Sequence, residues 1–221
     1  MISGANRGIG AAIARALAEQ GWRLSLGVRE PKKLGSAHFA HRYEALDAKS
    51  ERLWVDATTE RFGRIDAVIA NAGILSTKSV VEAGDDDVDA ILEVNVKSPL
   101  RLVRAAWPHL AKSGKGRVVV ISSLSGKRVK AAQTGLYAVS KFAALGLAHA
   151  VRHAGWEVGI RTTAICPGPV ATDMIRAIST LSPSEMTRPE DLAKLVLLVL
   201  DLPNTASLSE IPVNALIEGG Y

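Results

Sequence analysis

Short apolar runs, many of them β-branched, alternate along the chain with longer segments whose apolar residues recur at helical spacing. The strand-length runs lie at residues 22–26, 43–46, 67–70, 118–121, 162–165 and 213–217. The helical segments lie at residues 10–20, 50–62, 86–110, 136–152 and 189–200. Because strand and helix alternate throughout, the pattern predicts βαβ units with right-handed crossovers. It therefore predicts an α/β fold, a doubly wound, mostly parallel sheet with helices on both faces.

The first strand departs from this pattern. Only Met1 and Ile2 precede a glycine-rich turn, at a place where a strand of about five residues is expected. We expect either a very short first strand or a natural chain that starts upstream. No Pro-, Gly- or Ser-rich linker and no internal repeat divides the 221 residues, so a single domain over residues 1–221 is expected. Ligands of such a sheet bind beyond the carboxyl ends of its strands.

The composition is that of a soluble globular chain, with 48% apolar and 22% charged residues. The longest strongly apolar stretch, residues 192–202, is about half as long as a membrane span. No export signal is visible at the amino terminus, so we expect a cytoplasmic protein with no membrane partner. The single cysteine, Cys166, has no thiol partner, and the histidines show no ligand spacing, so no metal site is expected.

The chain is basic, with 27 Lys and Arg against 22 Asp and Glu. These charges are scattered and aromatic residues make up only 5% of the chain, so a nucleic-acid partner is not expected. The densest basic run, Lys127, Arg128, Val129 and Lys130, is interpreted as a solvated loop. A small ligand with phosphate groups would make better use of the excess positive charge.

A glycine-rich turn opens the first helical segment. Glycines let a backbone turn tightly and approach a pyrophosphate, which the positive end of the helix attracts. The spacing differs from G-x-G-x-x-G, and an ordinary turn is the alternative interpretation. As a cofactor site, the turn would contribute Gly4, Asn6, Arg7, Gly8, Ile9 and Gly10.

The next strand favours NADP(H) over NAD(H). Folds that prefer NAD place an acid about 20 residues after the glycines, where it binds the adenosine ribose. Here Val28 occupies that position and Arg29 follows it. No carboxylate repels a 2′-phosphate, and Arg29 and Arg7 can pair with it. The alternative is that both arginines are surface charges, and Glu30 would weaken the argument if the register slipped by two residues.

Tyr137 and Lys141 are four residues apart in a helical segment and therefore share a helix face. An ammonium group close to a phenol lowers the phenol's pKa from its reference value of about 10. Such a tyrosine can act as an acid near neutral pH. A solvated helix face is the alternative for this pair alone. The strand that ends at Ser122 and Ser123, fourteen residues before the tyrosine, places a hydroxyl beside it at the sheet edge.

Several motifs occur together, in one order, over nearly the whole chain. They are SGANRGIG at residues 3–10, Asn71-Ala72-Gly73, Asn95, ISSLSG at residues 121–126, YAVSK at residues 137–141 and Pro167-Gly168. Together they closely resemble the short-chain dehydrogenase/reductase family. The resemblance implies a Rossmann-type fold and hydride transfer between a nicotinamide cofactor and a small carbonyl or alcohol substrate.

The same resemblance assigns the catalytic residues. Tyr137 would be the general acid or base, and Lys141 would lower the tyrosine pKa and hold the nicotinamide ribose. Ser123 would bind the substrate oxygen, and Ser125 is the alternative for this role. Asn95 would anchor a water molecule that relays protons to Lys141. Its alternative is a structural one, because a buried amide can simply satisfy nearby backbone groups.

Further cofactor contacts follow from the resemblance. Asp47 would accept a hydrogen bond from the adenine amino group. Three residues after the fourth strand would line the adenosine ribose, and four others would close the nicotinamide side. The first set is Asn71, Ala72 and Gly73, and the second is Pro167, Gly168, Val170 and Thr172.

The segment at residues 170–182 would set substrate choice. It offers the apolar residues Met174, Ile175, Ile178 and Leu181, which suit an uncharged carbonyl compound, whereas Arg176 could hold a carboxylate. A homodimer or homotetramer is expected from the resemblance. Small residues on the catalytic helix would permit close packing between subunits: Ala138, Ala144, Gly146 and Ala148.

A different class of function stays open beside the enzyme. The chain could be a catalytically silent module that binds NADP as a sensor or scaffold. The short first strand and the Glu-Gly-Gly sequence at residues 218–220 are compatible with it.

Overall fold

A computed structural model describes residues 1–34 and 38–217, so the Glu-Gly-Gly sequence at 218–220 lies outside the described residues. The described residues form one seven-stranded sheet in the order β3-β2-β1-β4-β5-β6-β7, and every pair of neighbouring strands is parallel. The strands are β1 (Ile2–Ser3), β2 (Ser25–Val28), β3 (Phe39–Arg42), β4 (Ala67–Ala70), β5 (Arg117–Ile121), β6 (Arg161–Pro167) and β7 (Glu210–Val213). The predicted doubly wound parallel sheet is confirmed.

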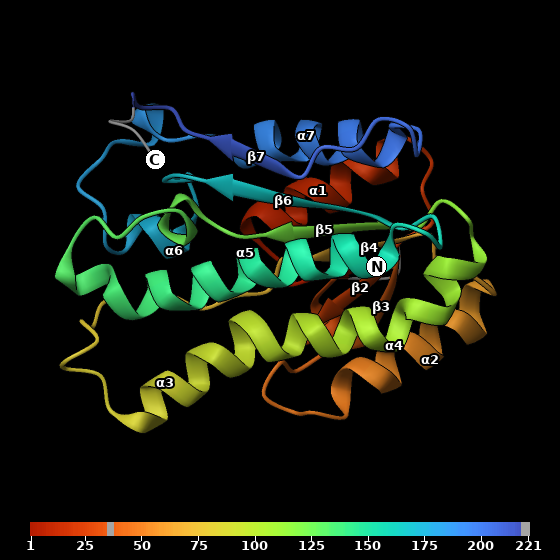
Figure 1. Ribbon diagram of the computed structural model, residues 1–221, viewed down its shortest axis with the longest axis horizontal. Coiled ribbons are helices and arrows are strands. Elements are labelled where there is room, and N and C mark those ends of the chain that lie inside the picture. The colour runs from red at the N-terminus through yellow and green to blue at the C-terminus, as the bar shows by residue number, and fades with distance from the viewer. Residues whose placement is uncertain (35–37, 218–221) are drawn as a thin grey trace.

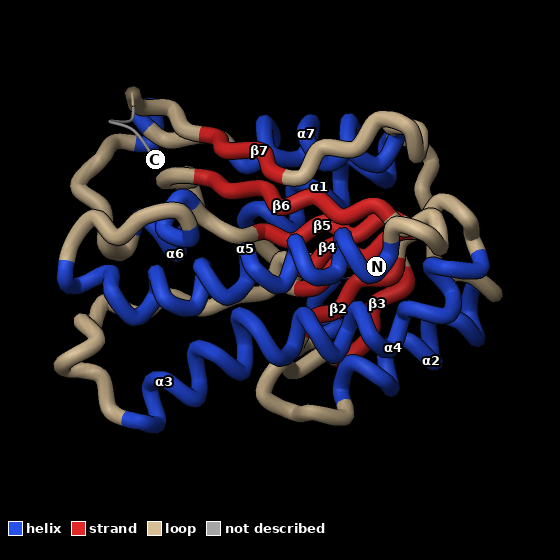
Figure 2. Tube along the Cα trace, viewed as in Figure 1, coloured by secondary structure: helices blue, strands red, loops and turns tan. Residues whose placement is uncertain are grey.

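Helices cover both faces of the sheet (Figures 1 and 2). One face carries α1 (Gly8–Glu19) and α7 (Pro189–Asp201), which pack against each other. The other face carries α2 (Ser50–Phe62), α4 (Ser98–Lys112) and α5 (Gly135–Gly155). The short helices α3 (Asp85–Leu92) and α6 (Asp173–Arg176) lie toward the edge of the sheet where its strands end (Figure 1).

Alternate residues of each central strand enter opposite layers of the core. Val118 and Val120 of β5 pack with α2, α4 and α5, whereas Val119 and Ile121 pack with α1 and α7. Both sets are at most 6% exposed. Strands buried on both faces have nearly continuous apolar sequences, which is why β4, β5 and β6 could be located from the sequence. β1 has only two residues, as the letters before the first glycine turn predicted.

The third strand lies earlier than predicted. The apolar run at 43–46 was interpreted as a strand, but β3 ends at Arg42. Tyr43 is buried because its ring packs on Trp54 of α2, with ring centroids 5.2 Å apart. The apolar residues at 43–46 therefore belong to a loop that packs against a helix. The last strand, predicted at 213–217, is β7 at Glu210–Val213, and its Pro212 is compatible with a place at the sheet edge.

The helix predicted at 86–110 is interrupted. A π-helical turn, Glu93–Lys97, separates α3 from α4, and the Ser98 N–H bonds to the Glu93 carbonyl five residues back. Pro99 has no N–H with which to bond the carbonyl of Asn95, four residues earlier, so a regular α-helix cannot continue through this point. Such π-helical turns are frequent at functional sites.

Candidate active site

A cavity of about 760 Å³ opens where the strands end. Its walls come from the segments that follow β1, β2, β3, β4, β5 and β6. The chain runs outward from β1 to β3 and then returns to place β4 on the other side of β1, so the cavity lies at the topological switch point. Open α/β sheets bind their ligands there, and the volume lies in the range of small-molecule sites.

The three glycines of the turn at residues 4–10 stand where a side chain would be strained or crowded. Gly4 and Gly8 have φ angles of +67° and +54°, a region that strains other residues. A Cβ on Gly10 would lie 2.3 Å from the Gly4 carbonyl oxygen. Both Gly4 and Gly8 line the cavity, so bare backbone at the start of α1 faces the space. This is the geometry that lets a pyrophosphate approach a helix N-terminus.

Asn71 ties the turn to the end of β4. Its Nδ2 donates to the carbonyl oxygens of Ser3 (2.9 Å) and Gly4 (3.2 Å). The Ser3 hydroxyl accepts from the backbone N–H groups of Asn71 and Ala72, each at 3.0 Å. Asn71, Ala72 and Gly73 all line the cavity, as predicted for a ribose wall. The Asn71 side chain itself serves the glycine turn.

The Ser123 side chain lies close enough to the Tyr137 hydroxyl to lower the pKa of the phenol. Ser123 is the second residue after β5, and Tyr137 lies in the first turn of α5. The Ser123 Oγ donates to the Pro167 carbonyl (3.3 Å) and accepts from the Ser125 N–H (3.1 Å). Of the two candidate serines, Ser123 is therefore the one in contact with the tyrosine, while the backbone of Ser125 orients it.

Lys141 lies one helical turn after Tyr137, with its Nζ 5.7 Å from the centre of the tyrosine ring. Nζ donates to the Ile121 carbonyl at 3.0 Å. Burial lowers the pKa of Lys141 to about 8. Burial also raises the pKa of Tyr137 to about 12, which the Ser123 side chain offsets only in part. The predicted lowering of the tyrosine pKa is therefore reversed here, because removing a phenolate from water outweighs the favourable polar contact.

Asn95 is buried in the π-helical turn and binds protein groups on both sides of its amide. Its Oδ1 accepts from the Ile74 N–H (2.9 Å), and its Nδ2 donates to the Ile74 carbonyl (3.0 Å) and to Ser140 Oγ (2.9 Å). Ser140 Oγ donates in turn to the Tyr137 carbonyl (2.7 Å). The Asn95 amide thus satisfies nearby backbone groups, as the structural alternative to a catalytic role predicted. It also links the loop after β4 to the helix that carries Tyr137.

The family model for short chain dehydrogenases matches residues 1–181. The chain belongs to this family. Agropine synthesis reductase from Rhizobium rhizogenes is 40% identical over 219 residues, which cover 93% of this chain and 50% of that protein. This short-chain dehydrogenase therefore spans about half the length of that relative.

Solved structures agree with the family assignment over the whole fold. An alcohol dehydrogenase from the archaeon Thermococcus sibiricus, complexed with 5-hydroxy-NADP, matches with a TM-score of 0.89 and 29% identity, covering 100% of this chain and 97% of that one. A short chain dehydrogenase from Burkholderia cenocepacia, in complex with NADP, matches with a TM-score of 0.86 and 29% identity, covering 97% and 95%. The Rossmann-type fold of the short-chain dehydrogenase family is thereby shown.

Two arginines face the part of the cavity next to the glycine turn of this short-chain dehydrogenase. Arg7 and Arg29 are exposed and both line it. Glu30 does not, because its carboxylate pairs with Lys33 at 2.7 Å. The Lys33 hydrogen bond lowers the pKa of Glu30. The cavity thus fits a ligand with phosphate groups, because a bare glycine cradle and two guanidinium groups line it.

The adenine contact expected of Asp47 stays a prediction. Ala45 and Leu46 of its loop line the cavity, whereas Asp47 does not line it. Its exposed carboxylate accepts from the Lys49 N–H at 3.0 Å and so closes a local turn before α2. Aspartate side chains form such turns readily, and this use competes with a role in binding.

The four residues expected on the nicotinamide side lie together in the wall of the cavity. Pro167, Gly168, Val170 and Thr172 all line the cavity. Thr172 lies next to the glycine turn, since a Cβ on Gly8 would be 3.1 Å from its methyl carbon. The segment after β6 therefore closes over the start of α1.

The predicted substrate wall is present in part. Met174, Ile175 and Ile178 line the cavity, but Leu181 does not. Arg176 is also outside the lining, because its guanidinium donates to the Ala171 carbonyl (3.3 Å). Sequence reasoning missed three polar residues. Ser140 was hidden inside the YAVSK motif, and Arg128 and Lys130, which line the cavity, were assigned to a solvated loop.

The small residues of α5 do not have the predicted outward orientation. Ala138, Ala144 and Ala148 are at most 2% exposed and pack inside the chain, whereas Gly146 is exposed. They allow α5 to lie close to its own sheet. The predicted homodimer or homotetramer, the single domain and the cytoplasmic location stay predictions.

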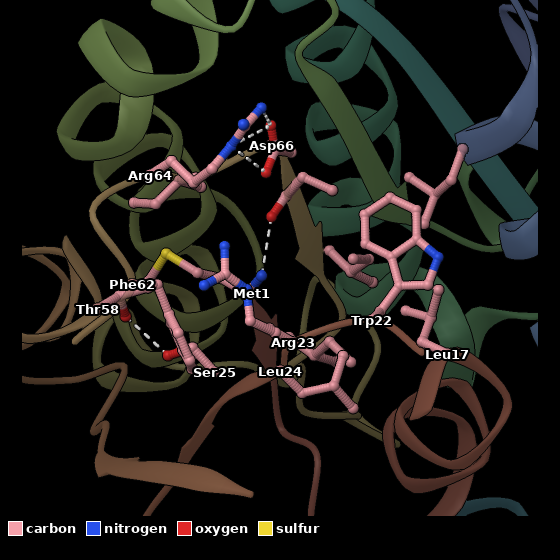
Figure 3. Close-up of a pocket in the computed structure, with 15 residues that line it drawn as sticks. Met1, Leu17, Trp22, Arg23, Leu24, Ser25, Thr58, Phe62, Arg64 and Asp66 are labelled. Carbon is pink, nitrogen blue, oxygen red and sulfur yellow. Dashed lines mark hydrogen bonds and ion pairs between the residues drawn. The ribbon is translucent and has the colours of Figure 1, made fainter. Parts of the chain in front are cut away.

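A second, smaller cavity lies at the opposite edge of the sheet (Figure 3). It measures about 90 Å³ and sits near the amino ends of β2 and β4, with Trp22, Arg23 and Asp66 in its lining. It is too small for a dinucleotide and lies at the wrong edge for a ligand of this fold. Within the described residues, no helix is long and apolar enough to cross a membrane, and no cluster of His, Cys, Asp and Glu could hold a metal ion.

Proposed function

We propose that this chain transfers a hydride between NADP(H) and a carbonyl or alcohol substrate, with Tyr137 as the general acid or base. The observation that carries the proposal is the convergence of Ser123, Tyr137 and Lys141 on one wall of the large cavity, with Lys141 Nζ 5.7 Å from the centre of the tyrosine ring. A hydroxyl pair at this place can bind a carbonyl oxygen and supply its proton. The dinucleotide supplies the hydride when it is bound.

Tyr137 donates a proton to the substrate oxygen during reduction. A pKa raised to about 12 keeps the phenol protonated at neutral pH, as an acid requires. Ser123 binds the same oxygen and stabilises the negative charge that develops on it. Its other hydrogen bonds, to Pro167 and Ser125, hold the hydroxyl in place before the substrate arrives.

Lys141, when protonated, stabilises the negative charge that Tyr137 develops as it gives up its proton. A pKa of about 8 allows its Nζ to exchange protons near neutral pH. The hydrogen bond to Ile121 fixes Nζ next to the end of β5. Asn95 acts as a positioning residue for the helix that carries Tyr137 and Lys141, because its Nδ2 donates to Ser140 Oγ of that helix and to the Ile74 carbonyl of the loop after β4.

The preference for NADP(H) over NAD(H) rests on Arg7 and Arg29. Guanidinium groups bind phosphates through paired, charge-assisted hydrogen bonds. The NADP complexes among the structural relatives support this preference. Replacing both arginines by glutamine should weaken NADPH binding about tenfold or more and leave NADH binding nearly unchanged.

A titration with NADPH and NADH, followed by a panel of aldehydes and ketones, tests the proposal. Wild type should bind NADPH more tightly and oxidise it in the presence of a carbonyl compound. The Tyr137→Phe variant should bind NADPH as wild type does and lose about 10²- to 10⁴-fold in kcat. Tight NADPH binding with no turnover across the panel would favour the silent sensor instead, and tighter binding of NADH would refute the role of Arg29.

A further inference from the structure

Two helical stretches present apolar residues at four-residue spacing to the large cavity. Ala90 of α3 and Val94 of the π-helical turn line it, and so do Met174 of α6 and Ile178 in the turn that follows α6. Residues four apart in a helix share a face. Because α3 and α6 lie at the edge of the sheet where its strands end (Figure 1), two apolar faces from distant parts of the chain border one cavity.

The loop after β4 adds two more apolar residues, Ile74 and Leu75, to this part of the wall. We call the six residues together the apolar lining: Ile74, Leu75, Ala90, Val94, Met174 and Ile178. Ile74 is 39% exposed, Met174 38% and Ile178 48%. Apolar surface left open in a cavity of ligand size marks a site for an apolar group.

The charges near the apolar lining already interact with other groups. Asp173 lines the cavity, and its Oδ1 lies 3.9 Å from Arg176 Nη1, while the same guanidinium donates to the Ala171 carbonyl at 3.3 Å. Arg128 and Lys130, which also line the cavity, interact with other groups as well. A substrate therefore meets chiefly apolar surface between α3 and α6.

Hydrogen bonds hold both sides of the apolar lining in place. On the α3 side, the Asn95 amide binds the N–H (2.9 Å) and the carbonyl (3.0 Å) of Ile74. The segment that carries α6 is tied at its two ends, because the Ala171 N–H donates to the Thr187 carbonyl and the Thr187 N–H to the Pro169 carbonyl, each at 3.0 Å. The lining is thus formed before a ligand arrives, as is usual for small-molecule sites.

The apolar lining lies at the catalytic end of the cavity. Asn95 follows Val94 in the π-helical turn and donates to Ser140 Oγ at 2.9 Å, and Ser140 Oγ donates to the Tyr137 carbonyl at 2.7 Å. The cofactor arginines, by contrast, follow β1 and β2. A group attached to a carbonyl that reacts at Tyr137 would therefore extend along the apolar lining.

We propose that the substrate is a carbonyl compound with an extended apolar group, an alkyl chain or an aryl ring, which packs against the apolar lining. This assignment rests on the proposed function and extends the expectation of an uncharged substrate to the group beyond the carbonyl. A hydroxyl or carboxylate at the far end of that group would lose water without gaining a hydrogen-bond partner.

A series of linear methyl ketones, from four to ten carbons, tests the proposal through turnover at saturating NADPH. Wild type should gain about threefold in kcat/KM for each added methylene group until the apolar lining is covered. A ketone that ends in a hydroxyl or a carboxylate should react about tenfold or more slowly than the methyl-ended ketone of equal length. Phenyl ketones of equal carbon number distinguish a ring from a chain.

Three variants locate the effect in the apolar lining. Met174→Gln and Ile178→Asn should each reduce the gain per methylene group to less than about twofold, because a polar side chain replaces apolar contact area. Both side chains are partly exposed, so neither change leaves a cavity in the core. Ala90→Leu fills space beside Val94, and the gain should stop at a shorter ketone than in wild type.

The control is Leu53→Gln. Leu53 lies on α2, is 57% exposed and does not line the cavity, so this variant should keep the wild-type gain per methylene group. A kcat/KM that does not depend on chain length, a preference for the carboxylate-ended ketone, or an unchanged gain in Met174→Gln and Ile178→Asn would refute the apolar substrate. The proposed function would stand in each of these cases, since the ketones are reduced.

A binding measurement decides the case in which no carbonyl compound is turned over, an outcome that refutes the proposed function. Calorimetry with the NADP⁺-saturated protein measures the dissociation constants of butanol and octanol. Octanol should bind to wild type about tenfold or more tightly than butanol, and the ratio should fall in the Met174→Gln, Ile178→Asn double variant. Equal binding of the two alcohols to wild type, no binding of octanol, or the same ratio in both proteins would overturn the apolar site.

Discussion

Arg101 of α4 binds the buried carboxylate of Glu51 of α2, with Nε 3.0 Å from Oε2. The Glu51 side chain is 1% exposed. The same guanidinium donates to the Ala45 carbonyl at 3.0 Å and pairs with Glu93 of the π-helical turn. A single side chain therefore connects the loop at the cofactor end of the cavity with the turn that carries Asn95.

Arg101→Leu should destabilise the protein by about 3–5 kcal/mol, because it leaves the Glu51 charge buried without its cation. It should also raise the KM for the dinucleotide, since the Ala45 loop loses an anchor. Urea unfolding and initial rates measure the two effects. Arg52→Leu, which breaks an exposed pair with Asp56, should change stability by less than about 1 kcal/mol. Equal losses in both variants would contradict the role of Arg101.

Ser123→Ala and Ser125→Ala should differ sharply in activity. Ser123 is the serine whose side chain lowers the pKa of Tyr137, so its loss should lower kcat about 10²- to 10³-fold. Ser125 contributes its backbone N–H to Ser123, which alanine retains, and its variant should stay within a few fold of wild type. Steady-state kinetics with one carbonyl substrate decide the matter, and similar losses in the two variants would show that the assignment is wrong.

Lys141 should make stability depend on pH in the alkaline range. Its pKa is about 8 in the folded chain and 10.5 in the reference state, so between these values the unfolded chain binds more protons. The burial cost, about 3 kcal/mol, is therefore fully present below pH 8 and disappears as pH rises to about 10.5. We expect Lys141→Met to be more stable than wild type at pH 7, with a smaller difference at pH 10.

Urea unfolding of both proteins at pH 7, 8.5 and 10 measures this trend. Tyr137 acts in the opposite direction, because a pKa raised to about 12 makes the folded chain lose stability above pH 10. Measurements should therefore stop at pH 10. A difference between wild type and Lys141→Met that stays constant over this range would refute the burial cost.

Gly10→Ala should damage the cofactor turn. The new methyl group would lie 2.3 Å from the Gly4 carbonyl oxygen and 2.6 Å from Asn71 Nδ2, so the backbone has to move. We expect a loss of about 1–3 kcal/mol in stability and weaker NADPH binding. In Gly84→Ala the methyl group would meet only Asp87, at 3.9 Å, and the cost should stay below about 1 kcal/mol. Thermal unfolding with and without NADPH compares the two.

The sequence was informative where one local pattern determines the structure. The runs at 67–70 and 118–121 are apolar throughout because both faces of β4 and β5 are covered, and few loops have that pattern. The four-residue spacing of Tyr137 and Lys141 also fixes a shared helix face without knowledge of the fold. The pKa values could not be predicted in this way, because burial depends on contacts with distant segments.

Loops were harder to predict, since their burial is decided by packing partners elsewhere. The apolar letters of Tyr43 and Ala45 arise from contact with α2 and the layer behind it. The charges of Arg128 and Lys130 face a cavity because the run folds over Leu124, which its composition does not reveal. Asp47 matched a family position by its letter, but its carboxylate closes a local turn.

The π-helical turn at Glu93–Lys97 joins two helices that serve different neighbours: α3 packs against α5, and α4 packs against α2. Each residue rotates an α-helix by about 100°, so the extra residue in this turn sets the apolar stripes of the two helices at different azimuths. Deletion of one polar residue from this turn would remove no apolar side chain. It would nevertheless rotate the apolar stripe of one helix away from the helix against which it packs. Asn95 lies in this turn, between the two helices whose apolar faces point in different directions.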